Sequence, residues 1–118
     1  MNRLLVAAIL TAAAMADEPA KAKRMTLTGL VVDTGCYLSH DTKGEKHIKC
    51  ATACAKAGVP LAILEEGSGT LYLPIAQDHK NQNLKLLPFI EKKVLVTGVV
   101  MEKNGLKGIV LRSVEAAP

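Results

Sequence analysis

Aromatic residues are scarce in this 118-residue chain, which has no tryptophan and only Tyr37, Tyr72 and Phe89 as aromatic positions. Proteins that hold single-stranded nucleic acid stack bases on aromatic side chains as well as neutralising phosphates. The formal net charge is +4, and the lysines are spread along the chain instead of forming a block. Nucleic acid is therefore not an expected partner, and the mild basicity indicates a solvated surface.

Long apolar runs are also missing, except at the N-terminus. Residues 4–14 are apolar apart from Thr11, follow the positive start MNR, and end in the A-x-A motif Ala14-Met15-Ala16. This layout is typical of a secretory signal peptide, and the run is too short for a comfortable transmembrane span. An N-terminal core or membrane helix is the alternative interpretation. We expect residues 1–16 to be a signal peptide, the mature protein to be periplasmic or secreted, and no stable membrane insertion.

The rest of the chain is long enough for one small domain. Residues 17–24 are polar and aperiodic and predict a flexible leader, followed by the domain at 25–116. Residues rich in β-branched side chains between turn formers predict strands. The predicted β elements are a first strand at 25–33 bent at Gly29, a hairpin at 61–75, and a final hairpin around the type I′ signal Asn104-Gly105.

A helical insertion is predicted at about 42–58. Thr42 and Glu45 have the spacing of a capping box, and the alanine-rich stretch 47–57 favours a helix whose alanines can pack closely on the barrel. Gly58 stands where a C-terminal glycine cap belongs. We expect residues 34–46 to be loop, and residues 83–90 to form a short helix limited by Pro88.

These elements predict a mainly β fold, a small five-stranded OB-like barrel. One Cys/His-bearing helix lies between strands 1 and 2, and a short helix precedes the final hairpin. The order resembles that of small exported bacterial OB-fold (BOF-like) proteins, which also begin with a signal peptide and a G-x-V first strand, here Gly29 to Val31. The inserted helix departs from that pattern, and its C-A-x-x-C-A-K-x-G segment is similar to one in small uncharacterised exported bacterial proteins. Neither resemblance implies functional residues, so the site is argued from chemistry.

The chain has three cysteines but no C-x-x-C pair and no C-x-x-C-H motif, which argues against a thioredoxin-type redox pair and a c-type haem. His47, Cys50 and Cys54 are spaced by three and four, so a helix would place them on one face. The gap after Cys36 is long enough for that residue to fold back over them. Three thiolates and an imidazole suit zinc or copper(I). The sequence therefore predicts a metal site formed by Cys36, His47, Cys50 and Cys54.

Two alternatives to a metal site stay open. An exported domain could carry a structural disulfide from Cys36 to Cys50 or Cys54, which would leave one thiol over. Cys50 and His47 could instead form a reactive thiol pair, but the sequence shows no third group that orients the base. We therefore expect a non-enzymatic, exported binding protein for zinc or copper(I), serving structure or envelope metal handling. The alternative is a disulfide-braced envelope OB-fold domain that binds another ligand; an unidentified envelope protein is a further candidate partner.

Overall fold

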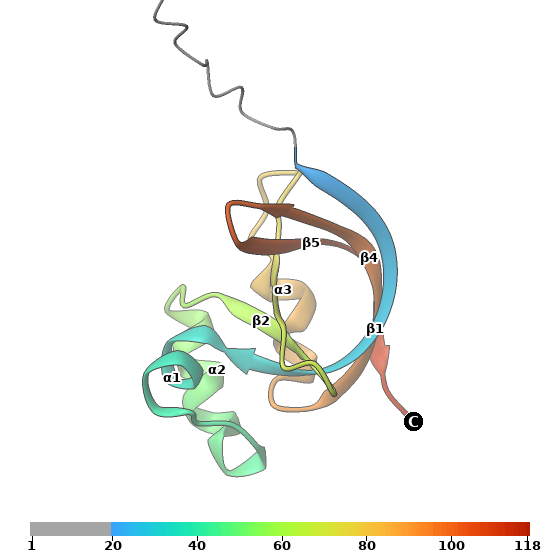
Figure 1. Ribbon diagram of the computed structural model, residues 1–118. Coiled ribbons are helices and arrows are strands. Elements are labelled where there is room, and N and C mark those ends of the chain that lie inside the picture. Colours follow the sequence, from blue (N-terminus) through green and yellow to red (C-terminus); the bar gives the residue numbers. More distant parts are fainter. Residues whose placement is uncertain (1–19) are drawn as a thin grey trace, which may run out of the picture.

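A computed structural model describes residues 20–118, which form a barrel with a helical insertion on one side (Figure 1). The predicted signal peptide at 1–16 and the start of the predicted leader lie outside the described residues. Strand pairing runs in the closed order β1-β2-β3-β5-β4, with β3 and β5 parallel and the other neighbours antiparallel. This is the predicted five-stranded OB-like barrel. Its strands are β1 (Lys21–Asp33), β2 (Leu61–Glu65), β3 (Leu71–Pro74), β4 (Lys93–Lys103) and β5 (Leu106–Ala116).

Strand β1 begins earlier than the sequence predicts. Lys21 to Arg24 pair with Glu102 to Val99 of β4, so the leader prediction is wrong for these residues. Their polar side chains are all exposed, and composition therefore gave no apolar alternation to mark a strand. Strand β1 extends this far because β4 is long, and the backbone N–H and C=O groups along all of β4 need hydrogen-bond partners.

Two glycines allow the strands of the barrel to approach closely. A Cβ atom on Gly29 would lie 2.5 Å from the backbone oxygen of Leu64, and one on Gly98 would lie 2.5 Å from that of Val110. The register between β4 and β5 also shifts at Thr97/Gly98. Gly29 in β1 and Gly98 in β4 thus mark two sites of close backbone approach.

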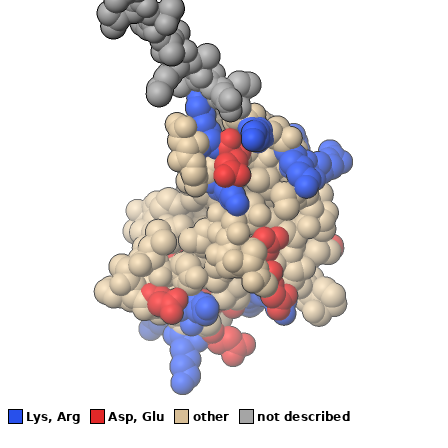
Figure 2. Space-filling model, viewed as in Figure 1, with Lys and Arg blue, Asp and Glu red and all other residues tan. Residues whose placement is uncertain are grey.

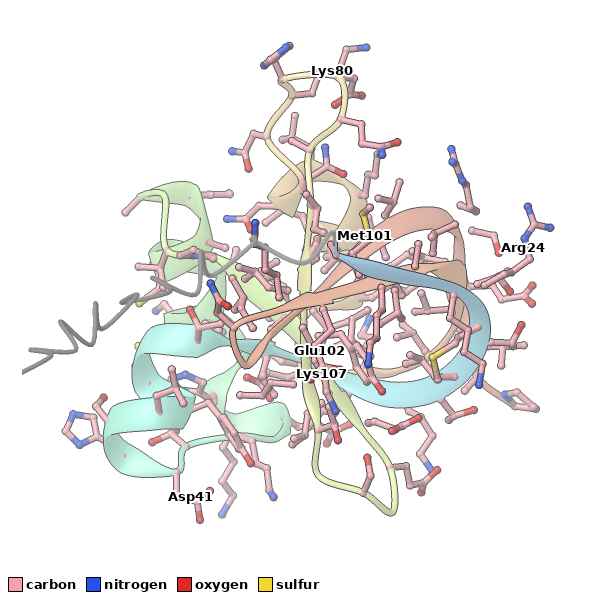
Figure 3. All side chains as sticks on the ribbon, turned by 45° about the horizontal axis from the view of Figure 1, so that its top comes forward. Arg24, Asp41, Lys80, Met101, Glu102 and Lys107 are labelled. Carbon is pink, nitrogen blue, oxygen red and sulfur yellow. The ribbon has the colours of Figure 1, made fainter. Side chains whose placement is uncertain are left out.

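The two predicted hairpins and the short helical segment are confirmed. Asn104 and Gly105 both have positive φ, 51° and 82°, as a type I′ turn requires. At this hairpin Glu102 of β4 is the register partner of Lys107 of β5 (Figure 3). A short helix α3 (Asn83–Leu86) continues into the 3₁₀ turn η2 (Leu87–Phe89), and Leu86 and Ile90 are buried against the barrel core.

The core is aliphatic, with Tyr72 as its buried aromatic residue. It gathers inward-facing side chains from all the strands and from the helices that cover one end of the barrel. The residues that are essentially inaccessible to solvent include Val31, Leu61, Ile63, Leu86, Val94, Val96 and Ile109. Among the described residues, no helix has the length and apolar character needed to cross a membrane.

The insertion between β1 and β2 contains more helix than expected. Residues 34–40, predicted as loop, form helix α1 (Thr34–His40) directly after β1. Asp33 makes this helix possible, because its side-chain oxygen accepts a hydrogen bond from the Cys36 N–H at 2.9 Å and caps the first turn. Figure 3 shows Asp41, which follows α1, at the outer end of the insertion.

Helix α2 (Ile48–Lys56) follows the 3₁₀ turn η1 (Glu45–His47), close to the predicted bounds. The predicted capping box is wrong: the residue before η1 is Gly44, and no side chain of the box caps it. The Thr42 N–H is instead used at the end of α1, where it donates to the Cys36 carbonyl. The predicted glycine cap is confirmed, because Gly58 has φ 103° and Val59 N–H donates to the Cys54 carbonyl, as in a Schellman motif.

Candidate metal centre

The four predicted ligands come from three short helical elements beside the end of β1, but their ligand atoms do not all fall into one mutually close group. Cys36 lies on α1, His47 ends η1, and Cys50 and Cys54 lie on α2. Ligand atoms of Cys36, His47 and Cys50 lie within 4.8 Å of one another. The Cys36 and Cys54 sulfurs share a second such group with an Asp33 oxygen, so Cys36 belongs to both groups.

His47 is fixed by a buried carboxylate that the sequence did not indicate as part of the site. Its Nε2 lies 2.6 Å from Oδ2 of Asp33, and both residues are buried. An ionised carboxylate can only accept, so Nε2 carries the proton and donates it to Asp33. In the neutral ring, Nδ1 then carries the lone pair that a metal ion can bind. A metal-bound histidine typically donates its other N–H to a carboxylate in this way.

Small side chains on α2 bring the thiols close to β1. Ala51 and Ala55 are buried against the core, as expected for alanines that face the barrel, whereas Ala57 is exposed and that part of the prediction is wrong. Ala57 lies beyond the last turn of α2, where the chain already turns away from the barrel. Cys50 is exposed and Cys54 is half-buried. The alanine face packs inward, and the neighbouring face presents the two cysteines to Cys36.

The surroundings of Cys36 and Cys54 disfavour ionisation of these two thiols. Burial is the largest cause that raises the pKa of the Cys36 thiol from 9.0 to about 11, and the charges of Asp33 and of the other two cysteines contribute to the same rise. Burial also raises the pKa of Cys54, and the charges of Cys50 and Asp33 act in the same direction. Thiolates are the nucleophilic form of cysteine, so these two residues are poor nucleophiles at neutral pH. A bound cation would reverse this effect, because a coordinated thiol loses its proton.

A second carboxylate, Glu91, lies behind the histidine. Its side chain is 3% exposed, and Oε2 accepts a hydrogen bond from the Gly44 N–H at 2.7 Å. Oε1 is buried and has no hydrogen-bond partner within residues 20–118. Oxygen atoms of Glu91 and Asp33 lie within 4.8 Å of each other and of a ring nitrogen of His47. Glu91 thus caps η1 from a distant part of the chain, and no sequence pattern pointed to it.

The raised pKa of the Glu91 carboxyl can be tested through the pH dependence of stability. Burial raises its pKa, the charge of Asp33 acts in the same direction, and the Gly44 N–H and His47 oppose the rise. A carboxyl whose pKa is higher in the folded state loses stability as pH rises through that pKa. We expect Glu91→Gln to raise the stability of the metal-free protein relative to wild type at pH 7. The difference should shrink as pH falls from the raised folded-state pKa towards the ordinary value near 4.5.

Urea unfolding between pH 4 and pH 8, with a chelator present, measures this pH dependence. Glu115→Gln is the matched control, because Glu115 is exposed on β5. The control should follow the wild type over the whole range. A stability difference between Glu91→Gln and wild type that does not change with pH would contradict the assigned shift.

Surface charge on the face shown in Figure 2 is mixed, with basic and acidic side chains interspersed over the barrel. The loop that carries Lys80 lies far from Asp41 at the outer end of the insertion (Figure 3). The thiol, imidazole and carboxylate groups beside β1 form the densest set of metal-ligating residues in the described part of the chain.

In comparisons with known proteins, no family model, curated protein or solved structure matches this chain.

Proposed function

We propose that this protein is an exported, non-enzymatic binding protein that holds one thiophilic metal ion through Cys36, His47, Cys50 and Cys54. Its residence in the periplasm or outside the cell rests on the signal-peptide pattern at residues 1–16. The ion serves either the structure of the insertion or metal handling in the envelope. Kinship with the small exported OB-fold proteins remains a prediction that the comparisons leave untested.

The observation that carries the proposal is the meeting of Cys36 with Cys50 of α2 beside a histidine, one of whose ring nitrogens already contacts Asp33. Cys36 is separated from Cys50 along the chain, yet their sulfurs and a His47 nitrogen lie within 4.8 Å. The Asp33–His47 contact at 2.6 Å fixes the ring so that Nδ1 is the free nitrogen. Second-shell carboxylates of this kind orient metal ligands and raise their basicity.

The raised pKa values of Cys36 and Cys54 favour binding over thiol catalysis. A nucleophilic cysteine needs a lowered pKa, and both of these shifts go the other way. Asp33 does supply the orienting group for His47 that the sequence failed to reveal, but it also holds a negative charge beside the thiols. A cation would neutralise that charge, whereas an activated thiolate would add to it.

Zinc and copper(I) are the two ions to distinguish. A closed set of three thiolates and one imidazole is typical of structural zinc. Soft thiolates also suit copper(I). We expect the protein, purified without chelator and under reducing conditions, to hold one zinc or copper ion per chain. Elemental analysis of the purified protein, with intact mass under native conditions, measures both the identity and the ratio.

The variant Cys36→Ser removes the one ligand that comes from α1 and should reduce metal content well below that of wild type. Ser39→Ala is the control, because Ser39 lies on the same helix and only hydrogen-bonds the Gly35 carbonyl. Wild-type protein that contains neither zinc nor copper, and takes up neither when each is added, would overturn the proposal.

A disulfide-braced domain that binds another ligand is the second candidate. The feature that favours it is a groove of about 450 Å³ between the insertion and the β2–β3 turn. Tyr37, Lys43 and Lys93 contribute to its lining, and the Lys43 ammonium lies 5.9 Å from the Tyr37 ring centroid. Thiol alkylation followed by intact mass separates the candidates when it is combined with metal uptake. A two-dalton deficit with one alkylatable thiol, and no metal uptake after reduction, supports bracing, whereas three alkylatable thiols after metal removal support metal binding.

A further inference from the structure

We propose that the same site undergoes thiol–disulfide exchange, and that oxidation of Cys50 and Cys36 to a disulfide releases the metal ion. This inference rests on the proposed function, because it assigns a regulation to that metal site. The sequence left a metal site and a disulfide as alternatives. Under this inference they are two states of the same three thiols. The reacting substrate is a small-molecule or protein disulfide, which an oxidising compartment supplies.

Cys50 is the thiol that an outside disulfide can reach. It is exposed, whereas Cys36 and Cys54 are half-buried. It lies in the first turn of α2, three residues after the buried His47, so it stands at the outer rim of the cluster. Rates of thiol–disulfide exchange depend strongly on access to the attacking sulfur.

Cys36 is the partner that the fold offers to Cys50. Their sulfurs lie within 4.8 Å and come from different helices, so the bridge need not be formed along one helix. Cys50 and Cys54 lie four residues apart on the regular helix α2, where disulfide geometry is hard to reach. Helix α1 has seven residues and none of them is buried, so it can shift towards α2 without opening the core.

The exchange consists of two displacement steps, in which bonds and electrons balance. The Cys50 thiolate attacks one sulfur of the disulfide R–S–S–R, the S–S bond breaks, and one RS⁻ leaves with the bonding electron pair. Cys36, which is deprotonated in the metal-loaded site, then attacks the Cys50 sulfur of the mixed disulfide, and the second RS⁻ leaves. Two cysteines lose two electrons, the outside disulfide gains them, and the two RS⁻ groups take protons from solvent. The metal ion keeps its oxidation state.

Release of the ion follows from the ligands that remain. After oxidation only Cys54 and His47 still offer a free thiolate and an imidazole nitrogen. A structural site closes four ligands around the ion, so a site reduced to two should lose it. Reduction of the disulfide restores the full set, which makes the change reversible.

The test uses the full mature protein loaded with zinc under reducing conditions and then freed of reductant. Oxidised glutathione is added, released zinc is followed with a chromophoric chelator, and the disulfide is located by peptide mass mapping. We expect zinc release to proceed together with the loss of two alkylatable thiols, a Cys36–Cys50 bridge in the product, and recovery of zinc binding after reduction.

Two matched variants separate the roles of the cysteines. Cys50→Ser should slow oxidation by glutathione about tenfold or more, because the accessible thiol is gone. Cys54→Ser keeps both reacting thiols and, compared as the reduced metal-free protein, should still form the Cys36–Cys50 bridge. Circular dichroism checks that each variant is folded before the rates are compared.

Several outcomes would overturn this inference while leaving the proposed function intact. These are oxidation without zinc release, a Cys36–Cys54 bridge in place of Cys36–Cys50, and a Cys50→Ser variant that reacts as fast as wild type. A reduced wild-type protein that binds no zinc or copper at all is a different result, because it overturns the proposed function itself and with it the release step.

Discussion

Replacing Asp33 by alanine is expected to lower the free energy of unfolding by about 3 kcal/mol and to weaken metal binding by about 10- to 100-fold. Asp33 is completely buried, caps α1 through the Cys36 N–H, and accepts from Nε2 of His47 at 2.6 Å. Alanine removes both acceptors and leaves the buried imidazole N–H without a partner. Urea unfolding and competition with a chelator of known affinity measure the two effects.

The variant Asp33→Asn separates positioning of the histidine from stability. Asp33 accepts from the Cys36 N–H through Oδ1 and from His47 Nε2 through Oδ2, and an asparagine has an acceptor oxygen at only one of these two positions. If its oxygen keeps the cap on α1, its NH₂ group faces the imidazole and forces the proton onto Nδ1. The helix should then be retained while metal binding falls.

Glu115→Ala, at an exposed position of β5, is the control for general effects of removing a carboxylate. It should change neither the free energy of unfolding nor the metal affinity by a measurable amount. An Asp33→Asn protein that binds metal as tightly as wild type would show that Nδ1 of His47 is not a ligand.

The variant Gly29→Ala is expected to lower the free energy of unfolding by about 3 kcal/mol. A Cβ atom at this position would lie 2.5 Å from the Leu64 backbone oxygen and 2.8 Å from Cγ2 of Ile63. The oxygen belongs to the β1–β2 ladder, in which Gly29 is paired with Glu65, so it cannot move without disturbing the barrel. Guanidinium unfolding followed by circular dichroism gives the change.

Gly35→Ala is the matched control for Gly29→Ala. The nearest heavy atom to its added Cβ is a methyl group of Val59 at 3.4 Å, which is close to ordinary contact. Gly35 lies in α1, so alanine there should be neutral or slightly stabilising, within about 1 kcal/mol. Equal losses for the two variants would show that the close approach at Gly29 does not constrain the barrel.

The barrel was predictable because its signals are local. Alternating β-branched residues, the Asn104-Gly105 turn and the glycine-centred strands act between near neighbours or across a tight turn, and the structure confirms them. The prediction failed where the local sequence signals were weak or were assigned to a different element. The polar start of β1 was taken for a leader, and helix α1 was taken for loop although Asp33, a favoured N-cap residue, precedes it.

The candidate site was predictable only in part. Spacing along one helix indicated that His47, Cys50 and Cys54 lie together, since a helical face follows directly from the sequence positions. Nothing in that spacing indicated Asp33 as the partner of His47 or Glu91 as the partner of Gly44. These contacts join the end of β1, the turn η1 and the segment just before β4, which lie far apart in the sequence.

The sequence by itself therefore determined the strands, the turns and the identity of the thiol and imidazole groups. The tertiary structure decided how those groups meet: Cys36 beside Cys50, a buried carboxylate on the histidine, and one exposed thiol among three. The physical reason is that periodicity and turn chemistry are local properties of the chain. Proximity, burial and the resulting shifts in pKa depend on which distant segments the closed barrel packs against each other.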